Sequence, residues 1–278
     1  MFDYDSPVAF SRLIAEYKLK FIHLSRAELE SCVSFGPAPC EAALGGSVYN
    51  YAANALRLEK NEKILLIDGS NSKYYLLAIN RIEKKRVTAD CRAVEIYDDI
   101  IKKEYNCFVG VLKGHANEEI VERLTELGAD SIFFFRSRYS QCDIGPEKLE
   151  RLYKIALSAS SQSRRLKAPL IQRLSFEEAV RRLAAPGARS FLMAEPSLCG
   201  GLDFAGAPAE AAFEALRKES AGSVNIVSGP EGGFERDEAS GILGTAAAIP
   251  VTLKNVVLRA CFAPQAALAI IKYRCGDL

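Results

Sequence analysis

Residues 223–240, SVNIVSGPEGGFERDEAS, decide the fold of this chain. The short apolar run predicts a buried strand, the glycine-rich stretch a loop, and the acidic run a helix. In an open parallel sheet, ligands bind outside the carboxyl ends of the strands, where such a loop lies. Gly229, Gly232 and Gly233 can adopt positive φ or bring bare backbone against a ligand. The segment therefore predicts a binding loop in an α/β domain, and the alternative is a tight turn without a ligand.

The carboxylate of Glu231, in the middle of this loop, restricts the ligand. A phosphate-binding P-loop requires Lys followed by Ser or Thr, and the G-x-x-G-G spacing is not that of a dinucleotide fold. A polyphosphate beside Glu231 would bring two anions together in a partly dry site. No G-x-S-x-G elbow surrounds Ser228, and the chain has 2 histidines, which disfavours a serine hydrolase. A neutral or cationic ligand is favoured, and S-adenosylmethionine, a sulfonium without phosphate, meets that condition.

Composition and charge are those of an ordinary globular protein. The chain has 278 residues, 49% of them hydrophobic, and a net charge of +1, so nucleic-acid binding must come from local basic patches. No apolar run approaches the roughly 20 residues that cross a bilayer. Residues 1–20 lack an apolar signal core, so a cytoplasmic protein without membrane contact is expected. The 8 scattered cysteines contain no CxxC pair, which predicts reduced, mostly buried thiols and no metal site.

Strand and helix patterns predict two domains after an N-terminal extension at residues 1–19. Residues 20–94 are rich in strand patterns, including a hairpin formed by KILLIDG and YYLLAINRI around the turn SNSK. Residues 95–278 alternate strand and helix patterns, which predicts a mostly parallel sheet covered by helices on both faces.

Capping residues mark several helices of the second domain. Asn117 is expected to cap one helix, and Gly128 to end it. Ser175 and Glu178 have the spacing of a capping box at the start of another helix. Pro264 fits the first turn of the last helix, where its missing N–H costs least.

A second strand–loop–helix pattern occupies residues 252–271, TLKNVVLRACFAPQAALAII. The side chains of Val256, Val257 and Leu258 fit a buried core, although their backbone can still touch a ligand. Arg259 is different, because a lone cation between an apolar run and a helix is expected to pair with another group more often than an average surface arginine.

At these residues the chain resembles a known family, the SPOUT-superfamily methyltransferases of the RsmE type, which methylate N3 of a uridine in 16S ribosomal RNA. The GPEGGF signature matches residues 229–234, and the pattern L-G-x-R-[IV]-L-R-x-E-T-A aligns with residues 253–263. TELG at 125–128 and the segments 55–75 and 156–171 resemble further family motifs. The resemblance covers nearly everything from residue 20 to the end.

The resemblance implies an N-terminal PUA-like β-barrel that helps hold RNA. It also implies a C-terminal SPOUT α/β domain with a deep trefoil knot, an exception to the rule against threaded chains. The implied partners are 16S rRNA or the small ribosomal subunit and a second copy of the chain in a homodimer, and the implied cofactor is S-adenosylmethionine. The residues implied to bind this cofactor are Leu192, Ala194, Gly229, Glu231, Gly232, Gly233, Leu253, Asn255, Val256 and Leu258.

The chemistry implied by the resemblance assigns catalytic roles to Arg259 and Glu231. Methyl transfer to N3 needs an in-line approach, and the uridine must be unpaired or flipped out. Loss of the N3 proton places negative charge on O2 and O4, which a nearby cation such as Arg259 would stabilise. Glu231 is a further member of the pocket, and no general base is evident in the sequence.

Local basic residues are expected to contact the RNA, although each single one also fits an ordinary solvated charge. Lys84 and Arg86 are expected on one face of a strand, with Lys85 on the other. The candidate RNA-binding residues are Arg57, Lys84, Arg86, Arg138, Arg164 and Arg165.

The chain departs from the family pattern at several polar positions. Ser161 stands in place of a glutamate, and Lys254 and Val256 in place of glycine and arginine. Cys261 and Phe262 stand where the family has Glu and Thr. Because these positions lie where RNA binding or catalysis is expected, two alternatives stay open. One is a divergent relative that modifies another RNA site, and the other is an rRNA-binding or assembly protein without catalysis.

Overall fold

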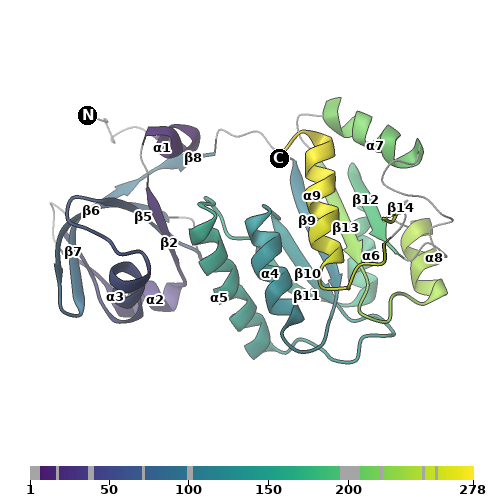
Figure 1. The fold of residues 1–278 in the computed structure, drawn as a ribbon, viewed down its shortest axis with the longest axis horizontal. Helices are drawn as coiled ribbons and strands as arrows, with labels where there is room; N and C mark the ends of the chain where they lie inside the picture. The colour runs from purple at the N-terminus through teal and green to yellow at the C-terminus, as the bar shows by residue number, and fades with distance from the viewer. Residues whose placement is uncertain are drawn as a thin grey trace. The chain divides into compact units, whose positions relative to one another are not determined.

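The chain folds into two compact units (Figure 1). The computed structural model describes residues 7–16, 19–36, 41–70, 73–98, 103–194, 207–218, 222–245, 248–253 and 256–278. The first unit comprises residues 1–100 and 157–168, and the second comprises residues 101–156 and 169–278. The first unit thus extends beyond the expected range of 20–94, because residues within 7–16 and 157–168 pack in its core.

A six-stranded, mostly antiparallel sheet forms the first unit, in the order β2-β5-β6-β7-β4-β3. The predicted hairpin is confirmed, since β5 and β6 pair antiparallel from Lys63↔Ala78 to Asp68↔Lys73. Strands β2 and β5 pair parallel. A separate parallel pair joins β1 (Val8–Ala9) to β8 (Ile96–Tyr97). The six strands of the sheet are β2 (Lys20–Leu24), β3 (Val33–Phe35), β4 (Glu41–Leu44), β5 (Lys63–Asp68), β6 (Lys73–Glu83) and β7 (Arg86–Val94).

This sheet is strongly curled. The ring centroids of Phe35 and Tyr75 lie 4.9 Å apart, although β7 and β4 separate their strands in the sheet order. The concave side encloses an apolar core with Val48 and Ala52, which lie in α3 (Gly46–Asn50) and the π-helical turn η1 (Tyr51–Ala55). The outer side of β2, β5 and β6 is covered by α1 (Phe10–Glu16) and by Leu166.

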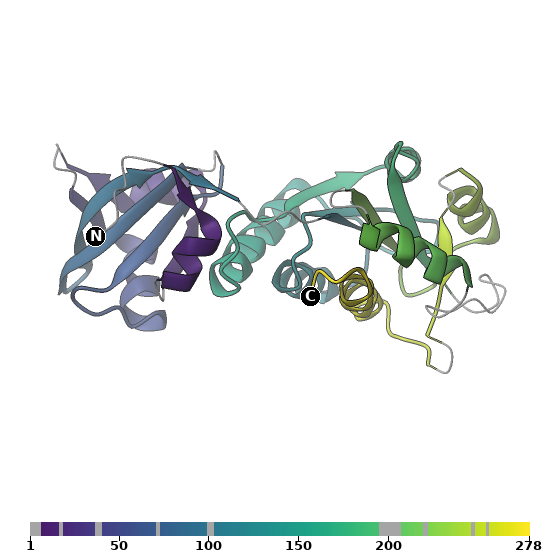
Figure 2. The same cartoon turned by 90° about the horizontal axis from the view of Figure 1, so that it is seen from above.

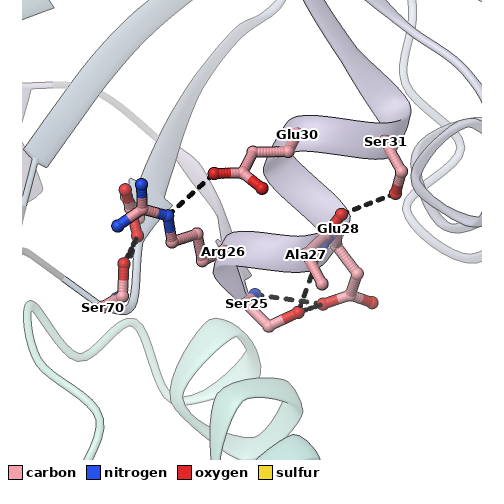
Figure 3. A network of polar contacts seen from close by, with 8 residues as sticks. Ser25, Arg26, Ala27, Glu28, Glu30, Ser31 and Ser70 are labelled. Atoms are coloured by element: carbon pink, nitrogen blue, oxygen red, sulfur yellow. Dashed lines mark hydrogen bonds and ion pairs between the residues drawn. The ribbon is translucent and has the colours of Figure 1, made fainter.

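Helix α2 (Arg26–Cys32) begins with a capping box (Figure 3). Ser25 Oγ accepts a hydrogen bond from Glu28 N at 3.4 Å, and Glu28 Oε2 accepts one from Ser25 N at 3.0 Å. Arg26 Nε pairs with Glu30 Oε1 at 2.7 Å one turn later. The Ser-x-x-Glu pattern, which predicts the helix at Ser175, therefore starts this short helix as well.

Lys84 and Lys85 form the two-residue turn of the hairpin between β6 and β7. Lys85 has a φ of +69°, and Glu83 pairs directly with Arg86. The prediction that Lys84 and Arg86 share one face of a strand is therefore wrong, because the alternation of faces applies only within a strand.

Six parallel strands form the sheet of the second unit, in the order β11-β10-β9-β13-β12-β14. The predicted parallel sheet is confirmed. The edge strand β11 was not predicted, because its pattern is mostly polar or exposed. The strands are β9 (Glu104–Gly110), β10 (Ser131–Phe135), β11 (Leu170–Leu174), β12 (Ala188–Met193), β13 (Ser223–Ser228) and β14 (Ile249–Val251).

Helices cover both faces of this sheet, as predicted (Figure 2). Helices α4, α7 and α9 and the first part of α5 pack on one face, and α6 and α8 on the other. No helix within the described residues is long and apolar enough to span a membrane. The helices are α4 (Ala116–Glu126), α5 (Pro146–Gln162), α6 (Phe176–Leu183), α7 (Ala207–Lys218), α8 (Arg236–Thr245) and α9 (Ala263–Cys275).

Three of the four predicted helix ends are confirmed. Gly128, at a φ of +86°, follows the end of α4. Ser175 and Glu178 form the capping box of α6. Pro264 lies in the first turn of α9. The fourth prediction is wrong, because Asn117 is buried inside α4 and does not cap it.

Candidate functional site

A cavity of about 180 Å³ lies at the carboxyl ends of β12, β13 and β14, which are neighbours in the sheet. The loops that follow these three strands form its wall. The lining residues are Met193, Ala194, Ser228, Gly229, Pro230, Glu231, Gly232, Gly233, Phe234, Thr252, Leu253, Val256, Val257, Leu258, Ala260 and Ala263. The two sequence segments that predicted a binding site thus meet at one cavity, together with the end of β12.

Most of the predicted cofactor residues lie at this cavity. Eight of them line it: Ala194, Gly229, Glu231, Gly232, Gly233, Leu253, Val256 and Leu258. Leu192 is fully buried in the core shared with α6 and α8, and Met193 lines the cavity instead. Successive side chains of a strand point to opposite faces of the sheet. A prediction that is wrong by one residue therefore names a core residue in place of the lining residue. Asn255 lies outside the described residues.

Besides Met193, the lining residues absent from the predicted cofactor set are Ser228, Pro230, Phe234, Thr252, Val257, Ala260 and Ala263. These seven lie within the two quoted segments, 223–240 and 252–271. A rule that extended each motif by one residue at its strand end would have found Ser228 and Thr252.

The glycine loop after β13 packs directly on the end of β9. A Cβ atom at Gly110 would lie 2.6 Å from both Cδ and N of Pro230, so only glycine fits there. Within the loop, Gly233 has a φ of +71°, and its N–H donates to Pro230 O at 2.9 Å. Close packing and a tight turn therefore fix the shape of this cavity wall.

Glu231 holds a second strand-end loop. Its Oε1 accepts a hydrogen bond from Lys113 N at 3.0 Å. The same loop is fixed from the other side by Asn117, whose Oδ1 accepts from Leu112 N at 3.0 Å and whose Nδ2 donates to Leu112 O at 2.6 Å. Asn117 therefore positions the loop after β9, and the carboxylate of Glu231 anchors the glycine loop to it.

The loop after β10 is tied to the start of α8. Arg138 N donates to Glu238 Oε1 at 2.8 Å, and the Arg138 guanidinium pairs with Glu235 Oε2 at 3.2 Å. Glu235 N in turn donates to Glu238 Oε2 at 3.0 Å. Arg138, predicted to bind RNA, is exposed and lies beside the cavity wall through these contacts.

Arg259 lies between two lining residues, Leu258 and Ala260. It is exposed, and its carbonyl oxygen accepts hydrogen bonds from Phe262 N and Ala263 N, both at 2.9 Å. Its guanidinium forms no ion pair with any residue in the described part of the chain. The first turn before α9 thus holds an exposed cation at the edge of the cavity.

The lining favours a ligand without phosphate. Among the lining residues in the described part of the chain, the single charged side chain is Glu231, and none is basic. The hydroxyl of Ser228 is buried without a hydrogen-bond partner among the described residues. Buried polar groups usually have partners, so this hydroxyl is a group that a bound ligand could satisfy. No described residues form a cluster of three or more His, Cys, Asp or Glu side chains suited to a metal ion.

The other predicted RNA-binding residues belong to the first unit. Arg57 and Arg164 are exposed and adopt positive φ angles of 48° and 53°. Lys84 and Arg86 are exposed at the hairpin tip, and Arg165 is half-buried.

Ser161, which replaces a family glutamate, binds within the first unit. Its Oγ accepts a hydrogen bond from His23 N at 2.9 Å and lies 3.3 Å from His23 Nδ1. Burial, and then the positive charge of Arg165, lower the pKa of His23 to about 4. The substitution is therefore accommodated by a neutral histidine, and no buried charge is left unpaired.

The fold and the cavity are those of an α/β protein with a pocket suited to a small, phosphate-free ligand at the carboxyl edge of a parallel sheet. Residues 101–272 match the family described as the RNA methyltransferase domain. Because this match covers more than half of the chain, the chain belongs to that family and is an RNA methyltransferase.

Named relatives resemble most of the chain. Ribosomal RNA small subunit methyltransferase E of Bacillus subtilis is 26% identical over 263 residues, which is 91% of this chain and 95% of that protein. The protein of the same name from Synechocystis is 27% identical over 228 residues, 80% of this chain and 69% of that protein.

Solved structures share the fold. The structure of ribosomal RNA small subunit methyltransferase E from Neisseria gonorrhoeae bound to S-adenosyl methionine has a TM-score of 0.67 at 22% identity. It covers 92% of this chain and 97% of its own. A probable rRNA-methyltransferase from Porphyromonas gingivalis has a TM-score of 0.68 at 20% identity, covering 93% and 99%.

Proposed function

We propose that this RNA methyltransferase transfers a methyl group from S-adenosylmethionine to N3 of a uridine in 16S ribosomal RNA. The observation that supports the proposal most is the cavity itself, in which the GPEGGF loop meets the loops after β12 and β14. The relatives from Bacillus subtilis and Synechocystis are named as methyltransferases of small-subunit ribosomal RNA. Such a substrate would place the protein in the cytoplasm with the assembling ribosome.

The residues at the cavity fit S-adenosylmethionine. Apolar side chains from Met193, Leu253 and Leu258 suit an adenosyl group, and Glu231 adds the negative charge that a sulfonium tolerates and a polyphosphate does not. The cofactor supplies an electrophilic methyl group when it is bound. Of the implied cofactor residues, Leu192 would act only through its place in β12, since its side chain is in the core.

Arg259 would act on the uridine. Arg259 is exposed and lies in the chain between the lining residues Leu258 and Ala260, so its guanidinium would reach the edge of the cavity where the base has to approach. A fixed cation there would stabilise the negative charge that develops on O2 and O4 as N3 loses its proton. Glu231 keeps one carboxylate oxygen bonded to the loop after β9, so its main catalytic contribution would be to position the cavity wall.

The first unit would hold the RNA as a PUA-like barrel. The contact between Phe35 and Tyr75 across the curled sheet supports a closed, barrel-like form. The exposed basic residues Arg57, Lys84, Arg86 and Arg164, with the half-buried Arg165, would contact phosphates. The second unit would be a SPOUT domain with a trefoil knot, in which the loops after β13 and β14 lie next to each other at the cavity, as such a knot requires.

A homodimer would complete the site. The expectation of a buried core is wrong for Val256 and Val257, which line the cavity and are 57% and 80% exposed. Phe262 at the start of α9 is 50% exposed. Exposed apolar side chains concentrated at one place are typical of an interface. Light scattering of the full chain should therefore give the mass of two copies.

The division of roles between the cofactor pocket and Arg259 can be tested with Arg259→Ala. The variant should bind S-adenosylmethionine with the affinity of the wild type in calorimetry, and lose at least about 100-fold in methyl transfer to small ribosomal subunits. A collapse of cofactor affinity in the variant would contradict the assignment of Arg259 to the base.

A further inference from the structure

Tyr139 has an exposed aromatic ring beside the methyl-donor cavity that the proposed chemistry does not use. It is 46% exposed and lies in the loop after β10. A Cβ atom at Gly232 would lie 2.8 Å from Tyr139 Cβ and 3.3 Å from Tyr139 Cγ, so the Tyr139 side chain packs directly against Gly232. Gly232 lines the cavity. The Tyr139 side chain therefore packs against a residue of the cavity wall.

The loop that bears Tyr139 is held in one conformation. Ser140 N donates to Ser137 O at 3.1 Å, and Ser137 N donates to Ser140 Oγ at 3.2 Å, which closes a turn around Arg138 and Tyr139. Arg138 N is bonded to Glu238 Oε1 at 2.8 Å. A fixed backbone under an exposed ring lowers the entropy cost of binding to that ring.

Charges around the ring suit a polyanion. Arg136 and Arg138 precede it in sequence, and both are exposed. Three carboxylates also lie in this region. Glu235 pairs with Arg138, and Asp143 accepts two hydrogen bonds from the Arg173 guanidinium at 2.8 and 2.6 Å. Glu238 accepts hydrogen bonds from the backbone N–H groups of Arg138 and Glu235 at 2.8 and 3.0 Å. Basic side chains interleaved with an exposed aromatic ring are the usual elements of single-strand nucleic-acid binding.

We propose that Tyr139 stacks on an unpaired base of the RNA substrate, next to the uridine that enters the methyl-donor cavity, while Arg136 and Arg138 contact the adjoining phosphates. Unpaired bases stack on aromatic rings in single-stranded RNA recognition. Tyr139 is then a positioning residue, which keeps the strand open and aligned beside Gly232. The inference rests on the proposed function for the identity of the RNA, and it gives the exposed ring of Tyr139 a role in binding it.

The test uses the full chain and a fluorescent, uridine-rich single-stranded RNA of about 12 nucleotides, long enough for one binding groove. Tyr139→Leu keeps an apolar side chain over Gly232 but removes the π face, and Tyr139→Phe keeps the π face. Tyr139→Leu should weaken RNA binding roughly tenfold, and Tyr139→Phe should stay within about twofold of the wild type. Arg136→Gln should lower the slope of log affinity against log salt by about 0.7.

Three results would overturn the inference. The first is RNA binding by Tyr139→Leu that equals the wild type. The second is an equal loss in Tyr139→Phe, since the hydroxyl and not the ring would then be responsible. The third is a changed mass in light scattering or a changed cofactor affinity in calorimetry for Tyr139→Leu, because the ring would then serve the dimer or the cavity wall. RNA binding is measured without cofactor. If the methyl-transfer proposal fails, the effect of Tyr139→Leu on RNA binding can therefore still be measured.

Discussion

Replacing Gly110 by alanine should disrupt the cofactor cavity from a position outside its lining. Gly110 ends β9, and the added Cβ would lie 2.6 Å from Pro230 Cδ, 2.6 Å from Pro230 N and 2.9 Å from Gly229 C. Ordinary van der Waals contact begins at 3.4 Å. The glycine loop would have to move away by about 0.8 Å, because the atoms that the new Cβ meets are two backbone atoms and one atom of the proline ring, none of which can rotate aside.

The expected cost follows from this displacement. Overpacking of this kind destabilises a protein by about 1–3 kcal/mol. A displacement near 1 Å at a reacting site can lower the rate about 100-fold. Gly110→Ala should therefore lower the urea midpoint of unfolding, weaken S-adenosylmethionine binding in calorimetry about tenfold, and reduce methyl transfer further.

Gly241→Ala is the matched control. Gly241 lies inside α8, and a Cβ there would have open space around it. Alanine in a helix is favoured over glycine by about 1 kcal/mol, so this variant should be slightly more stable than the wild type and bind the cofactor equally well. If Gly110→Ala were as stable as the wild type and bound the cofactor with the same affinity, the close packing of the glycine loop on β9 would be refuted.

Two further predictions concern charge. His23 has a pKa of about 4 in the folded chain and 6.5 when unfolded, so the unfolded state binds the extra proton and stability is lost as the pH falls from 6.5 towards 4. The wild type should lose about 2 kcal/mol of stability at pH 5 relative to pH 7. In urea unfolding, His23→Asn should not show this loss. The same pH dependence in the variant and the wild type would contradict the burial of a neutral imidazole. Glu231→Gln keeps an acceptor for Lys113 N but removes the charge, so it should weaken binding of S-adenosylmethionine several-fold and leave the neutral product S-adenosylhomocysteine unaffected. Equal effects on both ligands in calorimetry would show that the charge of Glu231 does not act on the sulfonium.

The sequence predicts the parallel sheet of the second unit well because its central strands are buried on both faces. β9, β10 and β13 each contain a short apolar run, and every residue in them is buried except the first of β9 and the first of β13. The edge strand β11 lacks that pattern, since Gln172 and Arg173 are not buried and only the last residue, Leu174, is. The apolar pattern of a sequence therefore identifies strands that are buried. It misses β11, which is a strand because its backbone pairs with β10 and not because its side chains are buried.

The candidate site was predictable where a motif is contiguous and not where contacts are distant in sequence. The glycine loop and residues 253–258 can be recognised from their composition alone. Nothing local indicates that Gly110 must lack a side chain to admit Pro230, or that Asn117 bonds to Leu112 and not to its own helix. Asparagine often caps helices, but the side-chain amide of Asn117 makes two buried hydrogen bonds to Leu112 instead and so cannot cap the helix.

The most direct test of the central claim is a reverse-transcription stop on 16S ribosomal RNA, compared between cells with and without this gene. Methylation at N3 blocks the Watson–Crick edge of uridine, so the account predicts one stop at a uridine that is present with the gene and absent without it. The Arg259→Ala variant should fail to restore the stop. Identical stop patterns with and without the gene would contradict uridine-N3 methylation by this protein.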